Sequence, residues 1–405
     1  RGTFDVLPAA ARVRDRIERT AAAIFARAGY EPIATPSFED TELFERGVGK
    51  STDIVRKEMF TFEDKGGRSL TLRPEGTAPI CRAYVEHGMH KLAQPVKLSY
   101  LGPFFRHERP QAGRYRQFHQ LGIEAIGADS PLADAEAIGL LAQLLAELGV
   151  PGVELRLGSL GSLAARQAYL EELKAHLHAH EDDLSVDVRE RIDANPLRAF
   201  DSDDEGTRGV MEAAPKLVER LEGDDAEHFE EVRTLLDAAG VAYAIDPTLV
   251  RGLDYYTRTI FSFVCDRLGA QSEIGGGGRY DGLVEQLGGP PTPAVGWAAG
   301  VERILLALGE GEEEARHDAF IAVANAEQRL QAFVLASQLH ANGLYAEIDL
   351  GGRGLKGQLK HADRIGARQV VILDADGAQL RDMESGEQRP VDPANLVEEL
   401  AGGKA

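Results

Sequence analysis

The stretch from Tyr100 to Gly127, YLGPFFRHERPQAGRYRQFHQLGIEAIG, decides the fold and indicates two strands joined by a basic loop. Side chains on a strand alternate between its two faces. One face of the first strand therefore carries Phe104, Arg106 and Glu108, and one face of the second carries Phe118, Gln120, Gly122 and Glu124. The lack of a side chain at Gly122 predicts room for a small ligand there. Such a surface has the parts to hold a nucleotide and a small polar molecule together.

The loop between these strands is basic, although the protein as a whole is acidic. It carries Arg109, Arg114 and Arg116, which suit a polyanion, whereas the formal net charge of the 405-residue chain is −21 at pH 7. This charge argues against a protein that coats nucleic acid through bulk attraction. It does not exclude a nucleic-acid partner, because such binding follows local basic patches.

The composition predicts a globular protein of the cytoplasm. The hydrophobic content of 43% is ordinary, and no apolar run approaches the roughly 18 residues that cross a bilayer. We expect no signal segment and no membrane. The cysteines Cys81 and Cys265 are isolated and form no CxxC pair or zinc-ligand spacing, which fits a reducing compartment.

Working outward from the central stretch, the periodicity of apolar residues predicts helices and strands on both sides. Helical spacing at 9–29 puts Ile17, Ala21, Ile24 and Phe25 on one stripe, and Ser130 is a plausible cap for a helix at 130–147. Short strands are expected at 57–77. Residues 161–240 are charged and poor in strand signals, which predicts an inserted helical domain. Strands are expected again at 242–265, followed by a glycine-rich stretch at 275–289 and a helix at 298–308.

Beyond a predicted solvated linker at 309–316, strands and helices alternate. Strands are expected at 319–323, 345–350 and 369–373, with helices at 326–341 and 354–366. This alternation predicts a small α/β domain whose sheet is at least partly parallel. We therefore predict an α+β protein with a catalytic core at 1–160 and 241–309, a helical insertion at 161–240 and an α/β domain at 318–405.

Three further segments carry groups suited to chemistry. The segment TLRPEGT at 71–77 is expected to place Arg73, Glu75 and Thr77 on one strand face, where a carboxylate and a hydroxyl could receive an ammonium group. The segment RGLDYYTRTIF at 251–261 contains a guanidinium, at Arg251, that could stabilise charge developing on a phosphate. The glycines at 275–278 would let backbone approach a ligand closely.

These segments together resemble the class II aminoacyl-tRNA synthetases in their histidyl form. Residues 100–127 are similar to motif 2 of that class, 293–303 to motif 3, and the stretch from the helix before Gly29 to Pro36 to motif 1. Residues 251–261 and 275–283 resemble the two peptides specific to histidyl enzymes. Trp297 stands where relatives usually carry a smaller aromatic residue. In motif 3, Gly296 and Gly300 are expected on one side of a helix.

The resemblance implies an enzyme that activates histidine with ATP and Mg²⁺ and transfers the histidyl group to tRNA(His). It implies an antiparallel catalytic sheet, a homodimer and a C-terminal anticodon-binding domain. Arg251 and Arg106 are then the catalytic residues. The residues implied for histidine are Glu75, Thr77, Gln120, Glu124, Tyr256 and Tyr280, and those implied for ATP are Arg106, Glu108, Phe118 and Arg303.

Two basic regions are expected to contact tRNA. In the motif 2 loop these residues are Arg109, Gln111 and Arg114. In the last domain Lys356, Lys360 and Arg364 recur every four residues and form a ridge on one helix. As an isolated observation this ridge fits a solvated helix face better than an RNA contact, and the resemblance favours RNA.

Two alternative functions remain open from the sequence. One is the non-catalytic regulatory subunit of ATP phosphoribosyltransferase, a relative that lacks the last domain and has eroded signature peptides. The other is a class II synthetase for another amino acid, against which the 251–256 peptide argues.

The segment GVGKST at 47–52 lacks the first glycine of a phosphate loop, because position 44 is Phe44. The histidines His87, His90, His176, His178 and His180 indicate no metal cluster, and the metal ligands stay unknown.

Overall fold

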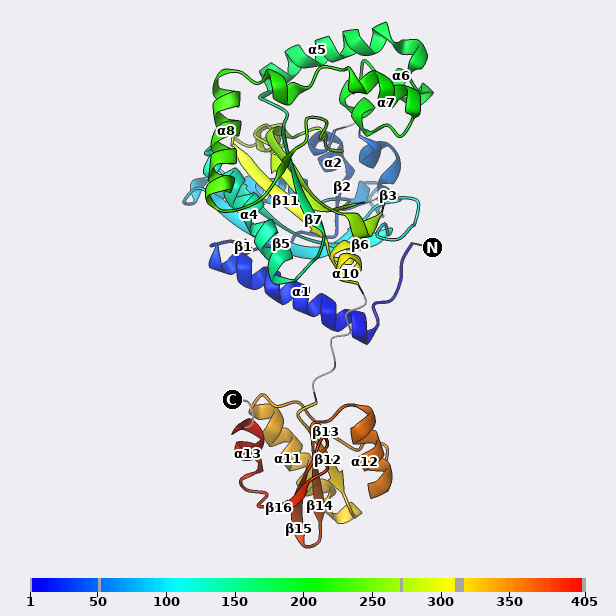
Figure 1. The fold of residues 1–405 in the computed structure, drawn as a ribbon, viewed down its shortest axis with the longest axis vertical. Coiled ribbons are helices and arrows are strands. Elements are labelled where there is room, and N and C mark those ends of the chain that lie inside the picture. Colours follow the sequence, from blue (N-terminus) through cyan, green and yellow to red (C-terminus); the bar gives the residue numbers. More distant parts are fainter. Residues whose placement is uncertain (1, 50–51, 270–271, 310–316, 403–405) are drawn as a thin grey trace. The chain divides into compact units, whose positions relative to one another are not determined.

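The paired strands predicted around residues 96–127 lie in a large sheet of this computed structural model, which describes residues 2–49, 52–269, 272–309 and 317–402 (Figure 1). The chain divides into two compact units, Arg1–Gly311 and Glu312–Ala405. Apart from Gly309, the predicted linker at 309–316 lies outside the described residues. Within the described ranges, no helix is long and apolar enough to cross a membrane.

An eight-stranded sheet forms the centre of the first unit, in the order β1-β5-β6-β11-β10-β9-β7-β8. All neighbours pair antiparallel except the two short edge strands, β1 with β5 and β8 with β7. In chain order the strands are β1 (Glu31–Pro32), β5 (Val96–Phe105), β6 (Gln117–Ile126), β7 (Val153–Ser159), β8 (Ala244–Ile245), β9 (Thr257–Cys265), β10 (Glu273–Arg279) and β11 (Ala294–Gly300).

One face of this sheet packs against a layer of helices. Side chains such as Ile123, Phe261 and Trp297 share one hydrophobic cluster with the stripe predicted on the first helix. In that stripe, Ile17 and Ile24 are almost fully buried. Figure 1 shows α1 running along this face. The helices of the layer are α1 (Pro8–Arg27), α4 (Pro131–Glu147), α8 (Gly223–Ala238) and α10 (Val301–Leu308). As predicted, Ser130 caps α4 by accepting a hydrogen bond from the Leu132 amide, at 3.2 Å.

The opposite face carries the smaller elements and a second hydrophobic cluster. A three-stranded antiparallel sheet has the order β2-β4-β3, with β2 (Phe38–Asp40), β3 (Phe60–Glu63) and β4 (Ser69–Leu72). The helices here are α2 (Thr41–Gly47), the π-helix η1 (Ile54–Glu58), α3 (Thr77–Glu86), η2 (Met89–Lys91) and α9 (Leu283–Gln286).

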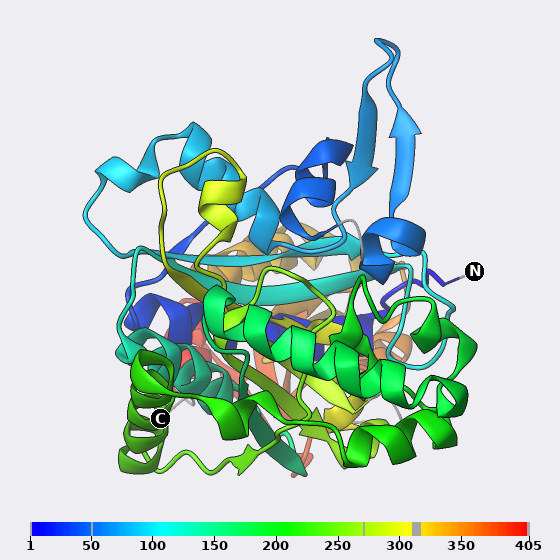
Figure 2. The ribbon, with the colours of Figure 1, turned by 90° about the horizontal axis from the view of Figure 1, so that it is seen from above.

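Residues 161–240, called the helical segment below, connect β7 to β8 without forming a strand. They contain α5 (Leu163–Ala179), η3 (Glu181–Asp183), α6 (Val186–Arg189), η4 (Pro196–Asp201), α7 (Glu205–Glu212), η5 (Leu217–Arg220) and α8. Figure 2 shows these green helices lying over the sheet. The last of them, α8, packs on α4 and buries Phe229, Val232 and Leu236 in the sheet's own core. The helical segment is therefore anchored in the main core at its C-terminal end.

Two local expectations were wrong. The predicted helix at 298–308 begins only at Val301, because residues 294–300 pair as β11 between β6 and β10, so Gly296 and Gly300 do not share a helix face. Arg73, Glu75 and Thr77 do not share a strand face, since β4 ends at Leu72 and Thr77 opens α3. The glycines at 275–278 belong to β10, where close strand neighbours leave no space for side chains, and Gly275 and Gly276 line the cavity described below.

A buried ion pair joins the sheet to the helices beneath it. Arg279, at the end of β10, binds Asp134 in the first turn of α4, and both side chains are 0% exposed. Arg279 also donates to the carbonyls of Ala128 and Ser130, at 2.8 and 3.2 Å. His228 of α8 lies 3.5 Å from the same Asp134 carboxylate. One side chain thus fixes β10, α4 and, through Asp134, α8.

The second unit is an α/β domain with a five-stranded sheet of order β13-β12-β14-β15-β16. Strand β12 pairs parallel with β13 and β14, which confirms the partly parallel sheet, and β14, β15 and β16 pair antiparallel. The elements of this unit are β12 (Ala319–Val323), η7 (Ala326–Gln328), α11 (Arg329–Ala341), β13 (Ala346–Ile348), α12 (Leu355–Arg364), β14 (Gln369–Asp374), β15 (Gly377–Asp382), β16 (Gln388–Val391) and α13 (Leu396–Gly402). The first unit also contains the short helix η6 (Asp266–Leu268), which directly follows β9. The predicted α+β class is confirmed.

Candidate active site

A cavity of about 650 Å³ lies on the sheet face opposite α1 and gathers most of the predicted site residues. Strands β6, β10 and β11 form its floor, and the loop at 250–256 and the motif 2 loop form its walls. The predicted residues that line it are Glu75, Thr77, Arg106, Glu108, Arg114, Phe118, Gln120, Arg251, Tyr256 and Arg303. Two others, Glu124 and Tyr280, lie buried behind this lining.

Glu124 forms the centre of a buried polar cluster. Its carboxyl accepts hydrogen bonds from the Thr77 hydroxyl, at 2.8 Å, and from the Tyr280 hydroxyl. Burial raises the pKa of Glu124 to about 8, and the two hydroxyls oppose this shift only in part. The carboxyl can therefore keep its proton near neutral pH and can exchange it with a ligand that titrates in the same range.

Two glycines determine how Glu124 and its neighbours fit. A Cβ atom on Gly296, which lies opposite Glu124 in β11, would be 1.7 Å from a Glu124 carboxyl oxygen. A Cβ atom on Gly122 would be 2.5 Å from the ring of Tyr100. The space above Gly122 is therefore filled by Tyr100, and our expectation that it is left for a ligand was wrong.

Glu75 holds the first turn of α3. Its two carboxyl oxygens accept the backbone N–H groups of Thr77 and Ala78, at 2.7 and 3.0 Å. Acceptors are favoured at this position because the first N–H groups of a helix have no partner within it. Burial raises the pKa of Glu75. The arrangement brings a carboxyl and the Thr77 hydroxyl together, as predicted, through a helix start rather than a strand.

Arg251 is held by a carboxylate and lies beside an aromatic ring. Its guanidinium is 2.6 Å from the Glu273 carboxylate and 5.8 Å from the centre of the Tyr256 ring. Burial alone lowers the pKa of Arg251, but the charge of Glu273 outweighs burial and raises it. The side chain is 13% exposed and lines the cavity, so a fixed positive charge faces the cavity interior.

Two more arginines of the cavity donate hydrogen bonds to backbone carbonyls. Arg106 donates to the Pro74 carbonyl, at 2.8 Å, and its guanidinium lies 5.3 Å from the Phe118 ring centre. Arg303 donates to the carbonyls of Gly113, at 3.2 Å, and Glu273. Arg106 also lies 3.7 Å from the Glu108 carboxylate, so its charge is partly balanced within the cavity.

Some buried polar atoms of the cavity have no hydrogen-bond partner among the described residues. They include the Gln120 side-chain oxygen and the Tyr100 hydroxyl. Buried polar groups are usually paired, so unpaired ones call for a polar ligand. Both residues line the cavity beside Glu75 and Thr77, which locates the polar part of a ligand at this end.

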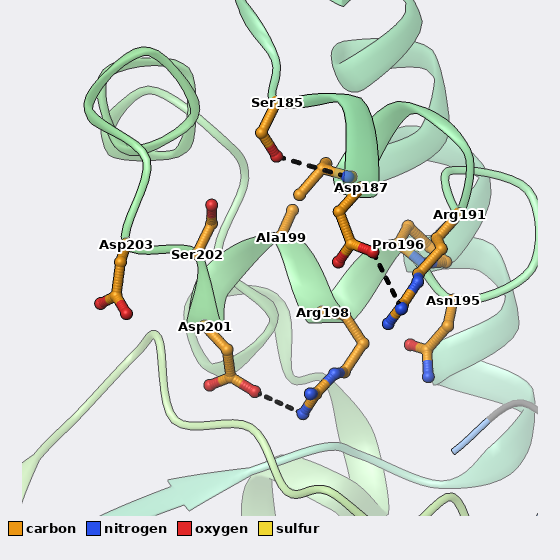
Figure 3. Close-up of a pocket in the computed structure, with 11 residues that line it drawn as sticks. Ser185, Asp187, Arg191, Asn195, Pro196, Arg198, Ala199, Asp201, Ser202 and Asp203 are labelled. Carbon is orange, nitrogen blue, oxygen red and sulfur yellow. Dashed lines mark hydrogen bonds and ion pairs between the residues drawn. The ribbon is translucent and has the colours of Figure 1, made fainter. Parts of the chain in front are cut away.

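The helical segment closes one side of the cavity and has a smaller cavity of its own, of about 230 Å³ (Figure 3). Arg198, Asp201 and Asp203 line both cavities. Figure 3 shows Arg198 directed toward Asp201, and the two side chains form an ion pair of 2.8 Å. Arg198 also reaches Asp53 of the core, at 2.9 Å. The helical segment thus contacts the core at the edge of the larger cavity.

The predicted RNA-contacting residues are mostly exposed. Arg109 and Gln111 are exposed on the motif 2 loop, and Arg114 pairs with Glu108 at 3.0 Å while lining the cavity. In the second unit, Lys356, Lys360 and Arg364 are exposed on α12, which confirms that they form a ridge on one helix. In the described part of the chain no group of three or more His, Cys, Asp or Glu residues is arranged to hold a metal ion.

Sequence reasoning missed several residues of the cavity. Glu273, which pairs with Arg251, stands two residues before the glycine run. The need of a buried guanidinium for a counter-charge was the signal that could have found it. Tyr255 lines the cavity with its hydroxyl 3.5 Å from Glu75. The hydrogen bond from the Tyr280 hydroxyl to Glu124 was not predicted either.

Comparisons with known proteins agree with this geometry. A family model described as Histidyl-tRNA synthetase matches residues 2–304, and one described as Anticodon binding domain matches 318–402. A Histidine--tRNA ligase of Rubrobacter xylanophilus is 48% identical over 418 residues, covering 99% of this chain and 99% of that protein. The crystal structure of apo S. aureus histidyl-tRNA synthetase is 36% identical, with a TM-score of 0.82, covering 99% of this chain and 98% of that chain.

A third similarity concerns the fold alone. The structure of an ATP phosphoribosyltransferase regulatory subunit/histidyl-tRNA synthetase from Bacillus halodurans is 24% identical, with a TM-score of 0.68, covering 92% of this chain and 98% of that chain. The full-length identity of 48% and the two family models carry the assignment. The chain therefore belongs to the histidyl-tRNA synthetase family.

Proposed function

We propose that this protein is a histidine–tRNA ligase, which activates histidine with ATP and transfers the histidyl group to tRNA(His). One observation carries the proposal. In a chain of net charge −21, the arginines Arg106, Arg114, Arg198, Arg251 and Arg303 line a single cavity, directly beside the buried cluster of Glu124, Tyr280 and Thr77. A polyanion and a small polar molecule can be held there side by side.

In this proposal the buried cluster binds histidine. Glu124 accepts a ring N–H of the imidazole, because each carboxyl oxygen has a second lone pair beyond the one used by Thr77 or Tyr280. The Tyr256 hydroxyl meets the other ring nitrogen. Because burial raises the pKa of Glu124 to about 8, above the ordinary imidazole pKa of about 6.5, the carboxyl keeps its proton and the hydrogen bond joins it to a neutral imidazole ring. Glu75, Thr77 and Gln120 hold the α-amino group.

The arginines bind ATP and stabilise the reaction. The histidine carboxylate attacks the α-phosphorus of ATP, and negative charge builds on the phosphate oxygens. A positive charge that is already oriented lowers the energy of this state. Arg251 and Arg106 have this role in the proposal. Phe118 and Arg303 lie on either side of the adenine, and Glu108, which follows the first motif 2 strand, also binds ATP. Mg²⁺ would enter with the ATP phosphates, and Glu108 and Glu273 supply the carboxylate oxygens that suit it.

Transfer requires tRNA to meet the same cavity. We propose that Arg109, Gln111 and Arg114 contact its acceptor end and that Lys356, Lys360 and Arg364 contact another part of the RNA. The domain boundaries of this proposal are 1–160 and 241–309 for the catalytic core, 161–240 for the insertion and 318–405 for the anticodon-binding domain. The two unpaired, buried cysteines support a cytoplasmic location.

The regulatory-subunit alternative is not favoured. It would not require Arg251, Tyr256 and Tyr280 beside a cavity for ATP, nor a domain at 318–402 that matches an anticodon-binding model. The two functions differ in a simple assay, since only a synthetase exchanges pyrophosphate into ATP when histidine is added.

The first prediction tests the chemistry. With histidine and ATP the wild-type protein should exchange pyrophosphate, and Arg251→Ala should lower the rate about 100- to 1000-fold, because it removes one oriented donor to the transition state. Histidine binding should largely survive. Arg220→Ala, at an exposed site of the helical segment, is the control. Exchange by Arg251→Ala near the wild-type rate would contradict the assigned role.

The second prediction tests the amino-acid pocket. Glu124→Ala should weaken histidine binding about 100-fold, because a buried N–H of the imidazole would lose its acceptor, and should leave ATP binding nearly unchanged. Isothermal titration with each substrate measures both affinities, and Glu147→Ala on the exposed side of α4 is the control. An unchanged histidine affinity in Glu124→Ala means that the pocket lies elsewhere.

The third prediction tests the ridge. Replacing Lys356, Lys360 and Arg364 by Glu should raise the KM for tRNA at least about tenfold and reduce the salt dependence of binding, because phosphate contacts are lost. Pyrophosphate exchange without tRNA should not change. Arg329→Glu, at an exposed position of α11, reverses one charge elsewhere in the same domain. If the triple variant charges tRNA as the wild-type protein does at physiological salt, the ridge is only a solvent-exposed helix face.

The fourth prediction concerns assembly. We propose a homodimer, as the resemblance to motif 1 implies. The exposed aromatic pair of Phe38 and Phe62, whose ring centres are 6.4 Å apart, supports it, because paired exposed rings favour burial in an interface. Light scattering on the intact protein should give twice the chain mass of 43.9 kDa. A single-chain mass across micromolar concentrations would refute the dimer.

A further inference from the structure

One residue outside the proposed substrate contacts has an unusual backbone. Arg258 has φ of +46° and is the only non-glycine residue with positive φ in the described ranges. Side chains disfavour this conformation, and it persists where surrounding contacts impose it. Arg258 lies two residues after Tyr256, at the point where the chain leaves the cavity wall and enters β9.

The contacts that impose this conformation come from the entry of the helical segment. The Arg258 N–H donates to the Gly161 carbonyl, and the Arg258 carbonyl accepts from the Leu160 N–H, both at 2.7 Å. Two short backbone hydrogen bonds thus clamp Arg258 to the junction between β7 and α5. The preceding residue, Thr257, is held by a different segment: its hydroxyl bonds to Asp281, the neighbour of Tyr280.

The Arg258 side chain reaches the other end of the same segment. Its guanidinium donates to one carboxylate oxygen of Asp225, at 3.1 Å, near the start of α8. The second oxygen of Asp225 accepts the N–H of Ser162, at 2.9 Å, just before α5. Arg258 therefore ties the first helix and the last helix of the helical segment to each other and to β9.

A second arginine connects this junction directly to the cavity. Arg166, in the first turns of α5, donates to the Tyr256 carbonyl at 2.5 Å. The Tyr256 ring lies beside Arg251 and is tilted against the Tyr255 ring, with the ring centres 4.8 Å apart. The backbone at Tyr256 is thus held from the helical segment, while its ring faces the proposed substrates.

We propose that Arg166 and Arg258 are positioning residues for histidine activation, and that the helical segment builds part of the histidine site when no RNA is bound. This inference rests on the proposed function. It assigns the segment a role in the first half-reaction, through the carbonyl of Tyr256 and the clamp at Arg258, in addition to any role in RNA binding.

The test measures pyrophosphate exchange without tRNA for two variants. Arg166→Met removes the donor to Tyr256 and keeps the length of the side chain. Arg258→Gly removes the guanidinium while glycine still accepts positive φ. Both should raise the KM for histidine, Arg166→Met roughly tenfold, with the KM for ATP changed less than about twofold. Arg166→Lys, which keeps a cationic donor, should restore part of the loss.

A matched control and a stability measurement separate positioning from folding. Arg220→Met is the same chemical change in the same segment, at an exposed pair with Glu172 of 2.8 Å, and should leave both KM values unchanged. A merely structural role would lower the melting temperature and kcat together and leave the histidine KM of the folded fraction unchanged, which would overturn the inference. An equal rise in KM for Arg220→Met would also overturn it. Failure of the wild-type protein to exchange with histidine would instead refute the proposed function.

Discussion

The buried pair of Arg279 and Asp134 is the interaction on which the rest of the first unit depends. Leaving either charge without its partner in the core costs about 3–5 kcal/mol, so the two elements that carry them are held together. Because neighbouring residues of a strand face opposite ways, anchoring Arg279 beneath the sheet fixes Tyr280 above it. Tyr280 in turn holds Glu124. An ion pair between β10 and α4 thus determines the geometry of the polar cluster on the other face.

The cavity is prepared electrostatically before any ligand enters. Glu273 orients Arg251, and its backbone carbonyl receives Arg303, so one residue fixes two guanidinium groups. Groups that are already oriented need no rearrangement during a reaction, and this is the main source of electrostatic stabilisation in enzymes. The net charge of the whole chain is therefore negative, whereas the local charge of this cavity is positive.

Much of this arrangement could be predicted because it follows from local patterns. The stripe through Ile17 and Ile24 predicted α1, and alternation at 96–127 predicted the β5–β6 pair and the clustering of Arg106, Phe118 and Gln120. The start of motif 3 was predicted as a helix, because small residues such as Gly296 show neither the helical nor the strand pattern of apolar residues. Only pairing with the neighbouring strands makes this segment a strand. The partners of Glu124 and Arg251 come from distant segments, and pairing of this kind depends on tertiary packing that single-sequence periodicity does not contain.

The contact between Gly296 and Glu124 has a consequence for how this pocket can change. A methyl group at position 296 and a glutamate at position 124 would occupy the same volume. Neither position can therefore vary independently. A larger residue can replace Gly296 only after Glu124 has been replaced by a shorter residue. Directed evolution that randomises only the pocket lining would leave this constraint in force, whereas a paired library on β6 and β11 would remove it.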